Sequence, residues 1–322
     1  MESHLRTLLR NYMNSMDGII ATAIVDKNGL IITSDSKEEA GENSDMILGA
    51  ISAILDDYIE RIKKEFDTES SFFNITTTGD KKFAFCSKGP HSILTTVTKP
   101  DTSETEIKVL SEHVAGKIEL LLEGKKNVAV NIPEIVKVLS QTKGGTLPKG
   151  EYSSKLILTG DFSVGKTSLI RRFVENRFQD KYISTIGVDI SKHIVKLTPE
   201  TNVNYIIWDI GGQGHKNFAS HRKRFYNGAN CALIVFDRTR PKTLNDVEEW
   251  YDDIKESVDS NIPIVLVGNK SDLIDEVVVS EEEVKQIAGK LGFNYILTSA
   301  KTGDNVDDAF LYVAYKFLQK LQ

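Results

Sequence analysis

One short stretch, residues 160–167, constrains the fold of this chain more than any other. It reads GDFSVGKT and fits the pattern G-x-x-x-x-G-K-[ST]. The apolar run 155–159 precedes it, and residues 168–174 follow with apolar side chains at helical spacing. A strand, a glycine-rich turn and a helix in this order are typical of a loop that binds phosphate groups through its backbone N–H groups. The alternative is an ordinary glycine-rich turn, and the later motifs argue against it.

The loop contains candidate ligands for a phosphate chain and a metal ion. Its glycines let the backbone approach the phosphates closely, and the helix N-terminus favours an anion electrostatically. Lys166 supplies a mobile cation for the outer phosphates, and the Thr167 hydroxyl is a candidate Mg²⁺ ligand. The predicted ligand-binding residues of this stretch are Gly160, Ser163, Val164, Gly165, Lys166, Thr167 and Ser168.

Composition indicates a globular protein long enough for two domains, with 322 residues, 40% hydrophobic and 27% charged. The net charge is −6, and residues 1–125 alone carry 21 Asp and Glu against 14 Lys and Arg. Neither half is basic enough for a nucleic-acid-binding surface. No apolar run approaches the ~20 residues of a transmembrane helix, and we find no lipidation motif. We therefore expect a cytoplasmic protein without a membrane anchor of its own.

The cysteines and histidines do not form a metal-binding pattern. Cys86 and Cys231 fall in predicted strands, and because no C-x-x-C pair occurs we expect buried free thiols. His91 and His113 are isolated in the sequence, and we expect them to be structural or surface groups. No residue set in 1–125 is predicted to be catalytic.

Residues 1–125 are expected to form a small α/β domain. The patterns predict helices over 2–14, 42–66 and 103–123, and strands over 18–25, 30–34, 72–78, 82–87 and 91–98. The pair Asn28-Gly29 favours a hairpin between the first two strands. This order of elements predicts a five-stranded, mostly antiparallel sheet with helices packed against it.

The order of elements, and the segment Gly18–Ser34 in particular, resembles the roadblock family of dynein light-chain relatives. The resemblance covers about residues 1–123. It implies pairing into dimers, often through the sheet and the long second helix, and a role as a platform or regulator for small GTPases. The alternative is that the apolar stripe of the 42–66 helix only covers its own sheet.

Residues 126–153 have the composition of a linker, with glycine, lysine, threonine and proline gathered over 141–150. Within it, residues 131–139 are predicted to form a short helix, with Asn131 as its cap and a proline in its first turn. Its apolar side chains suggest that it docks onto one of the two domains.

Strands alternate with helices from residue 154 to residue 322, which predicts a mostly parallel, six-stranded sheet with helices on both faces. In such a sheet the ligand binds at the carboxyl ends of the strands. Thr185 and Asp209, the latter after strand 203–208, are candidate Mg²⁺ ligands at this edge. The Gly212 N–H is placed to contact a terminal phosphate, and Gln213 to orient an attacking water.

Two further stretches at this edge are suited to recognising guanine. Asn269, Lys270 and Asp272 follow the strand 264–268, and the aspartate can accept two N–H groups from guanine while repelling the edge of adenine. Lys270 can lie against the base ring. The segment Ser299-Ala300-Lys301 follows the strand 295–298, and its backbone can meet the guanine carbonyl.

Residues 154–322 resemble the Ras superfamily of small GTPases, because five motifs occur in the right order, each just after a strand or the first helix. Residues 182–189 look most like the Rab branch and residues 208–213 more like the Arf branch. The resemblance implies binding of GTP and GDP with Mg²⁺ and slow hydrolysis without an activator. It assigns Lys166, Thr185 and Gln213 to catalysis, and it implies that Phe178 stacks on guanine.

Two features depart from that family. Phe162 occupies a position in the loop that usually holds a small residue, and we hypothesise that it crowds Gln213 or blocks a partner's arginine and so slows hydrolysis. The alternative is that its ring points outward over the loop. The basic segment 214–226 is about two residues longer than its counterparts. It is either a solvated helix face or a docking surface for an acidic partner.

The sequence therefore predicts a GTP-hydrolysing switch in three parts. Residues 1–125 form a roadblock-like domain for dimerisation or regulation, residues 126–153 a linker, and residues 154–322 a small GTPase domain. We expect a homodimer or a roadblock-domain partner, together with effector and regulator proteins that the sequence does not name. The alternative is a nucleotide-dependent scaffold with little hydrolysis of its own.

Overall fold

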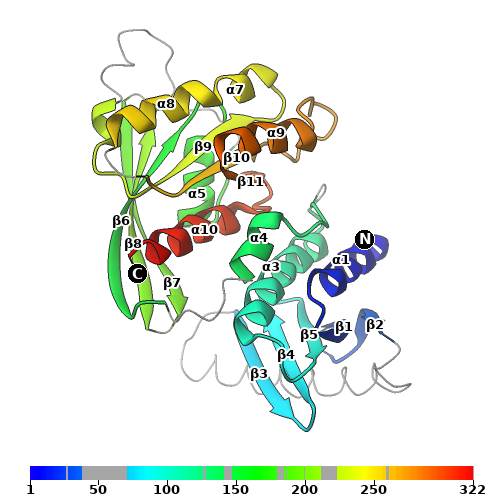
Figure 1. Ribbon diagram of the computed structural model, residues 1–322. Coiled ribbons are helices and arrows are strands. Elements are labelled where there is room, and N and C mark those ends of the chain that lie inside the picture. Colours follow the sequence, from blue (N-terminus) through cyan, green and yellow to red (C-terminus); the bar gives the residue numbers. More distant parts are fainter. Residues whose placement is uncertain are drawn as a thin grey trace. The chain divides into compact units, whose positions relative to one another are not determined.

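The computed structural model describes residues 1–321 except residues 27, 38–70, 126–127, 141–146, 180–184, 186, 199, 212–222 and 259–260 (Figure 1). The predicted helix over 42–66 and the predicted residues Gly212 and Gln213 lie outside the described residues. The chain forms two compact units, Met1–Gly145 and Thr146–Gln322.

The first unit contains a five-stranded antiparallel sheet, as the sequence predicts. Its strand order is β2-β1-β5-β4-β3. The strands are β1 (Ile19–Asp26), β2 (Ile31–Ser36), β3 (Phe72–Thr78), β4 (Lys81–Ser87) and β5 (Ser92–Thr98). The helices described in this unit are α1 (Glu2–Ser15), α3 (Glu104–Leu122) and α4 (Glu134–Ser140).

Helices α1 and α3 join the sheet through apolar stripes and one buried polar cluster. The Ser103 side chain caps α3 by accepting from the Glu106 N–H, which explains where this helix begins. The Tyr12 hydroxyl of α1 lies 3.1 Å from Thr96 Oγ1 of β5 and 2.8 Å from Ser111 Oγ of α3. Burial raises the pKa of Tyr12 to about 12, so this residue stays a neutral hydrogen-bonding link between three elements.

His91 is not isolated in the folded chain, in contrast to its appearance in the sequence. Its Nδ1 lies 2.7 Å from Glu119 Oε2, and its N–H donates to Oε1 of the same carboxylate at 3.1 Å. The Ser92 N–H adds a third bond to Glu119. The buried carboxylate of α3 therefore anchors the turn between β4 and β5. His113 is buried, with 7% exposure.

The short helix predicted over 131–139 is present as α4, and it packs against α3. Ile135 and Val136 of α4 are fully buried. Just before the helix, the Lys117 ammonium of α3 donates to the Ala129 carbonyl at 2.5 Å. This part of the expected linker thus lies within the first compact unit.

The second unit contains a six-stranded sheet of order β11-β10-β9-β6-β8-β7, in which only the β7–β8 pair is antiparallel. Helices α5 and α10 lie on one face and α7, α8 and α9 on the other (Figure 1). The strands are β6 (Gly150–Thr159), β7 (Val188–Thr198), β8 (Thr201–Ile210), β9 (Cys231–Asp237), β10 (Ile264–Asn269) and β11 (Asn294–Leu297). The helices are α5 (Lys166–Glu175), α7 (Pro241–Asn245), α8 (Val247–Ser257), α9 (Glu281–Leu291) and α10 (Val306–Gln319).

Strand β6 begins earlier than the sequence predicts. Its first residues are polar and follow a stretch of linker composition, so the pattern placed the start of the strand at residue 155. The structure pairs Gly150 with Thr201 and Tyr152 with Val203 of β8. Backbone hydrogen bonds to a neighbouring strand stabilise this polar segment, and side-chain hydrophobicity does not report them.

Both cysteines are buried free thiols, as predicted. Burial raises the pKa of Cys86 and of Cys231 to about 12. Among the described residues, no helix combines the length and the apolar character needed to cross a bilayer.

Candidate active site

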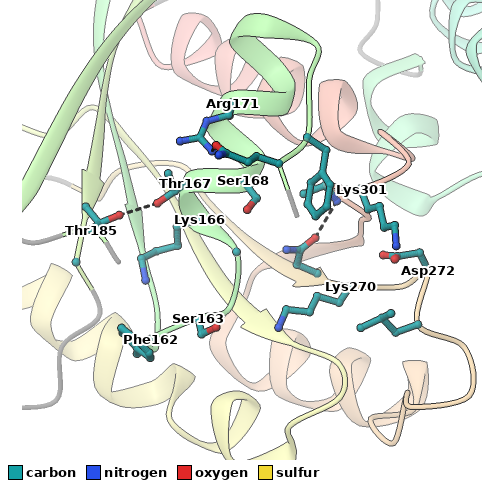
Figure 2. Close-up of a pocket in the computed structure, with 17 residues that line it drawn as sticks. Phe162, Ser163, Lys166, Thr167, Ser168, Arg171, Thr185, Lys270, Asp272 and Lys301 are labelled. Carbon is teal, nitrogen blue, oxygen red and sulfur yellow. Dashed lines mark hydrogen bonds between the residues drawn. The ribbon is translucent and has the colours of Figure 1, made fainter. Parts of the chain in front are cut away.

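A cleft of about 310 Å³ lies at the carboxyl ends of the parallel strands (Figure 2). Most of the residues predicted from separate motifs meet in its wall. They are Ser163, Gly165, Lys166, Thr167, Ser168, Phe178, Thr185, Asn269, Lys270, Asp272, Ala300 and Lys301. The predicted residues Gly160, Val164, Asp209 and Ser299 lie behind this wall, where they contact the residues that line the cleft.

The two glycines of the phosphate loop have conformations that other residues rarely adopt. Gly160 has φ +135° and Gly165 has φ +101°. A Cβ on Gly160 would lie 2.0 Å from the Val235 carbonyl oxygen, and one on Gly165 would lie 2.2 Å from Asn269 Nδ2. The loop therefore needs glycine at both positions, for backbone conformation and for space.

Lys166 folds back over the loop at the start of α5. Its Nζ donates to the carbonyls of Gly160 at 2.7 Å and of Asp161 at 2.8 Å, and the side chain is buried. The ammonium thus lies in the concave loop where phosphate groups are expected.

Three side chains form an oxygen cluster beside the lysine. The hydroxyls of Thr167 and Thr185 lie 2.7 Å apart (Figure 2), and both donate to Asp209 Oδ2. The other carboxylate oxygen, Oδ1, is buried and has no hydrogen-bond partner among the described residues. Burial raises the pKa of Asp209, while the hydrogen bond from Thr167 acts in the opposite direction. A buried carboxylate with an unsatisfied oxygen and two adjacent hydroxyls suits a hard divalent cation such as Mg²⁺.

The Asn269 side chain links the phosphate loop to the loop 299–301 through hydrogen bonds. Its Nδ2 donates to the Val164 carbonyl of the phosphate loop at 2.9 Å. Its Oδ1 accepts from the Ala300 N–H at 3.2 Å and from Thr298 Oγ1 at 3.3 Å. The amide is buried, so this side chain fixes the distance between the phosphate end and the opposite end of the cleft.

The carboxylate predicted to read the base is held by the last loop. Ser299 Oγ donates to Asp272 Oδ1 at 2.7 Å and accepts from the Thr302 N–H at 3.1 Å. Asp272 and Lys301 lie together at one end of the cleft, and Thr167 and Thr185 at the other (Figure 2).

Arg172 was not predicted from the sequence, although it holds the loop 299–301. Its Nε donates to the Ala300 carbonyl at 2.9 Å and its Nη2 to the Lys301 carbonyl at 2.7 Å. The two acceptors lie 128 and 129 residues further along the chain. No local pattern connects α5 to this loop, so no sequence signal identified this contact.

Lys270 is held by a buried carboxylate that the sequence analysis also missed. Its Nζ lies 2.6 Å from Asp237 Oδ2 at the end of β9. Burial tends to raise the pKa of Asp237, but the hydrogen bonds from Lys270 and Thr239 outweigh it and the pKa is lowered. Asp237 therefore stays charged and fixes the ammonium in the cleft wall.

Five further residues line the cleft. Among them, Arg171 donates to Gln179 Oε1 at 3.0 Å, which links α5 to the segment that follows it. Phe162 is 43% exposed and lies at the same end of the cleft as Lys166. The five are Phe162, Arg171, Gln179, Gly211 and Leu273.

Residues 155–319 match the Ras family. The chain belongs to the Ras family. Among its curated relatives, the Ras-related protein RABD1 of Arabidopsis thaliana is 37% identical over 171 residues, which are 53% of this chain and 82% of that protein. The GTP-binding protein YPTM2 of Zea mays is 39% identical over 167 residues, covering 52% of this chain and 81% of that protein.

As a member of the Ras family, this protein is a GTPase. Like the family, it binds GTP and GDP together with Mg²⁺. Both relatives are of the Rab and Ypt kind, which agrees with the Rab-like character of residues 182–189. The range that matches the family lies in the second compact unit, so the family match does not include the first unit.

Proposed function

We propose that this Ras-family GTPase is a molecular switch whose Mg²⁺ is held by Thr167, Thr185 and Asp209. The observation that carries the proposal is the oxygen cluster these residues form, in which one buried Asp209 oxygen has no hydrogen-bond partner within the described part of the chain. Thr185 lies 18 residues after Thr167 in the chain. Because the two hydroxyls are in contact, binding or loss of the metal and the terminal phosphate would act on Thr185 directly.

The proposed chemistry is hydrolysis of GTP to GDP and phosphate. Lys166 supplies positive charge for the outer phosphates, and Gln213 orients the attacking water. Bound Mg²⁺ offsets negative charge on the phosphate oxygens. Asp272 accepts the N–H groups of guanine, while Ser299 holds the carboxylate in place. The ring of Phe178, in the cleft wall, stacks on the base.

We also propose that residues 1–125 form a roadblock-like domain that dimerises the protein or regulates the GTPase domain formed by residues 154–322. Support comes from the five-stranded antiparallel sheet and from the helices α1 and α3 that pack with it. Residues 126–153 join the two domains in sequence, with α4 packed in the first unit and β6 beginning at Gly150 in the second.

A second candidate function is a nucleotide-dependent scaffold with little hydrolysis. One observation favours it: the half-exposed ring of Phe162 occupies the cleft wall beside Lys166, at the end where the terminal phosphate is expected. A bulky group there can obstruct the attacking water or an activating arginine. The two candidates share the nucleotide site and differ only in turnover.

Multiple-turnover release of phosphate from GTP separates the two functions. The switch predicts sustained release that requires Mg²⁺ and falls to background in Asp209→Asn, which keeps the side-chain shape and removes the charge. Nucleotide binding without sustained release, alone or with a cell extract that supplies an activator, would favour the scaffold.

Light scattering of the full chain with GDP and with a non-hydrolysable GTP analogue tests the proposed dimer. We expect the mass of a dimer in at least one nucleotide state. A monomer in both states at micromolar concentrations would contradict a dimerising role of residues 1–125.

A further inference from the structure

The carbonyl groups of the phosphate loop accept hydrogen bonds from side chains. Lys166 Nζ binds the carbonyls of Gly160 and Asp161, and Asn269 Nδ2 binds the carbonyl of Val164. In a trans peptide the C=O and the following N–H point in opposite directions. A donor that holds one carbonyl of this loop therefore also fixes the direction of the next N–H.

Arg240 holds a further carbonyl of the loop, that of Phe162. Its Nη2 donates to the Phe162 carbonyl at 2.8 Å, while its Nε donates to Asp237 Oδ2 at 2.9 Å. The Asp237 side chain is only 1% exposed, so the guanidinium is anchored on a rigid group at the end of β9. Arg240 lies just before α7 and is not among the residues that line the cleft.

The next residue, Ser163, has a backbone conformation that needs such a restraint. Its φ is +63°, in the left-handed region that residues with a Cβ disfavour. The described peptide bonds are all trans, so the Ser163 N–H points away from the carbonyl that Arg240 holds. Ser163 itself lines the cleft.

We propose that Arg240 is a positioning residue for phosphate binding, which turns the Ser163 N–H toward the cleft by holding the Phe162 carbonyl. The proposal rests on the proposed nucleotide site and deepens it. Arg240 acts on the Phe162–Ser163 peptide as Asn269 acts on the Val164–Gly165 peptide. Neither side chain needs to touch the phosphates to set the direction of these donors.

The contacts of Asp237 predict that removing Arg240 affects phosphate binding but not base recognition. Asp237 Oδ2 also accepts from Lys270 Nζ, and Asp237 Oδ1 accepts from the Thr239 N–H and hydroxyl. These partners remain when the arginine is removed, so Lys270 keeps its anchor. Loss of Arg240 should therefore weaken phosphate binding without changing the preference for the base.

The test measures release of a fluorescent GDP analogue from the full-length chain. In Arg240→Ala we expect release to accelerate about tenfold, the effect of losing one hydrogen bond to a charged group. Arg240→Lys keeps a cation but lacks the guanidinium group that donates to two acceptors at once, so it should accelerate GDP release less than Arg240→Ala does. The matched control is Lys290→Ala, which removes an exposed cation of α9 that pairs with Glu248, and it should release at the parent rate.

Two readouts distinguish positioning from general loosening of the structure. The ³¹P chemical shift of the GDP β-phosphate should move in Arg240→Ala and stay unchanged in Lys290→Ala. The affinity ratio of GDP to inosine diphosphate, which lacks the 2-amino group of guanine, should equal that of the parent.

The proposal is overturned if the parent binds GDP and Arg240→Ala releases it at the parent rate with an unchanged ³¹P spectrum. It is also overturned if release accelerates and the GDP to inosine diphosphate ratio changes with it, because that would indicate disorder across the whole cleft. A parent chain that binds no GDP would instead refute the proposed function. If Arg240→Ala does not fold, the same comparisons with Arg240→Lys decide.

Discussion

Replacing Gly165 with alanine should strongly destabilise the second unit. At φ +101° an L-residue is disfavoured by roughly 1–2 kcal/mol. The new Cβ would lie 2.2 Å from Asn269 Nδ2, so this amide must move and release the Val164 carbonyl. A buried donor left without its acceptor costs about 1–3 kcal/mol. Together these effects lower the free energy of unfolding by about 2–5 kcal/mol.

The assay is urea unfolding followed by tryptophan fluorescence at a fixed GDP concentration. Both tryptophans of the chain, Trp208 in β8 and Trp250 in α8, belong to the second unit, so the signal reports this unit alone. With a denaturant dependence of ~2 kcal/mol per M in urea, the midpoint should fall by about 1–2.5 M. GDP must be matched between samples because a bound ligand stabilises the folded state.

Gly289 provides the matched control. It lies inside α9, and a Cβ built there meets no described atom within 4 Å apart from the neighbouring residues and the backbone of its own helix. Alanine at this position should raise stability by about 0.5–1 kcal/mol, since glycine loses more backbone entropy in a helix. A Gly165→Ala midpoint equal to or above that of the parent would refute the reasoning, whatever Gly289→Ala does.

Three further predictions follow from other parts of the structure. Phe162→Gly should accelerate single-turnover GTP hydrolysis, and an unchanged rate, both alone and with an activator, would reject the crowding hypothesis. A chelator of Mg²⁺ should accelerate GDP release from the parent but have little additional effect on Thr167→Ala, which lacks one oxygen of the cluster; equal chelator effects in both proteins would argue against Thr167 as a ligand. Because the pKa of Cys86 and Cys231 is raised to about 12, a thiol reagent at pH 8 should label neither in the native chain and both after unfolding. Rapid native labelling would contradict the described burial.

In the first unit, local sequence patterns predicted the secondary structure but not the contacts between its elements. Alternating apolar residues and turn signals predicted the five strands and the helix over 103–123 to within about two residues at each end. The same patterns did not reveal that Glu119 receives three hydrogen bonds from the turn at His91. The glycine at position 89 belongs to this contact, because a Cβ there would lie 2.5 Å from the Glu119 carboxyl carbon.

The sequence by itself determined the features that depend on neighbouring residues. These are the order of strands and helices, the glycine loop between β6 and α5, and the separate motifs that the parallel sheet brings to one edge. Each is encoded over a few residues, by side-chain periodicity or by the backbone freedom of glycine. The identity of Thr167, Asp209 and Asp272 as candidate ligands followed from the same local context.

Only the tertiary structure decided which side chains hold these motifs in place. Arg172 reaches carbonyls 128 and 129 residues away, and Arg240 reaches the Phe162 carbonyl across 78 residues. Asp237 joins Arg240 to Lys270 because β9 and β10 are neighbours in the sheet. Such contacts depend on the packing of distant elements. An arginine or aspartate that makes them carries no local signal different from that of a solvated surface residue.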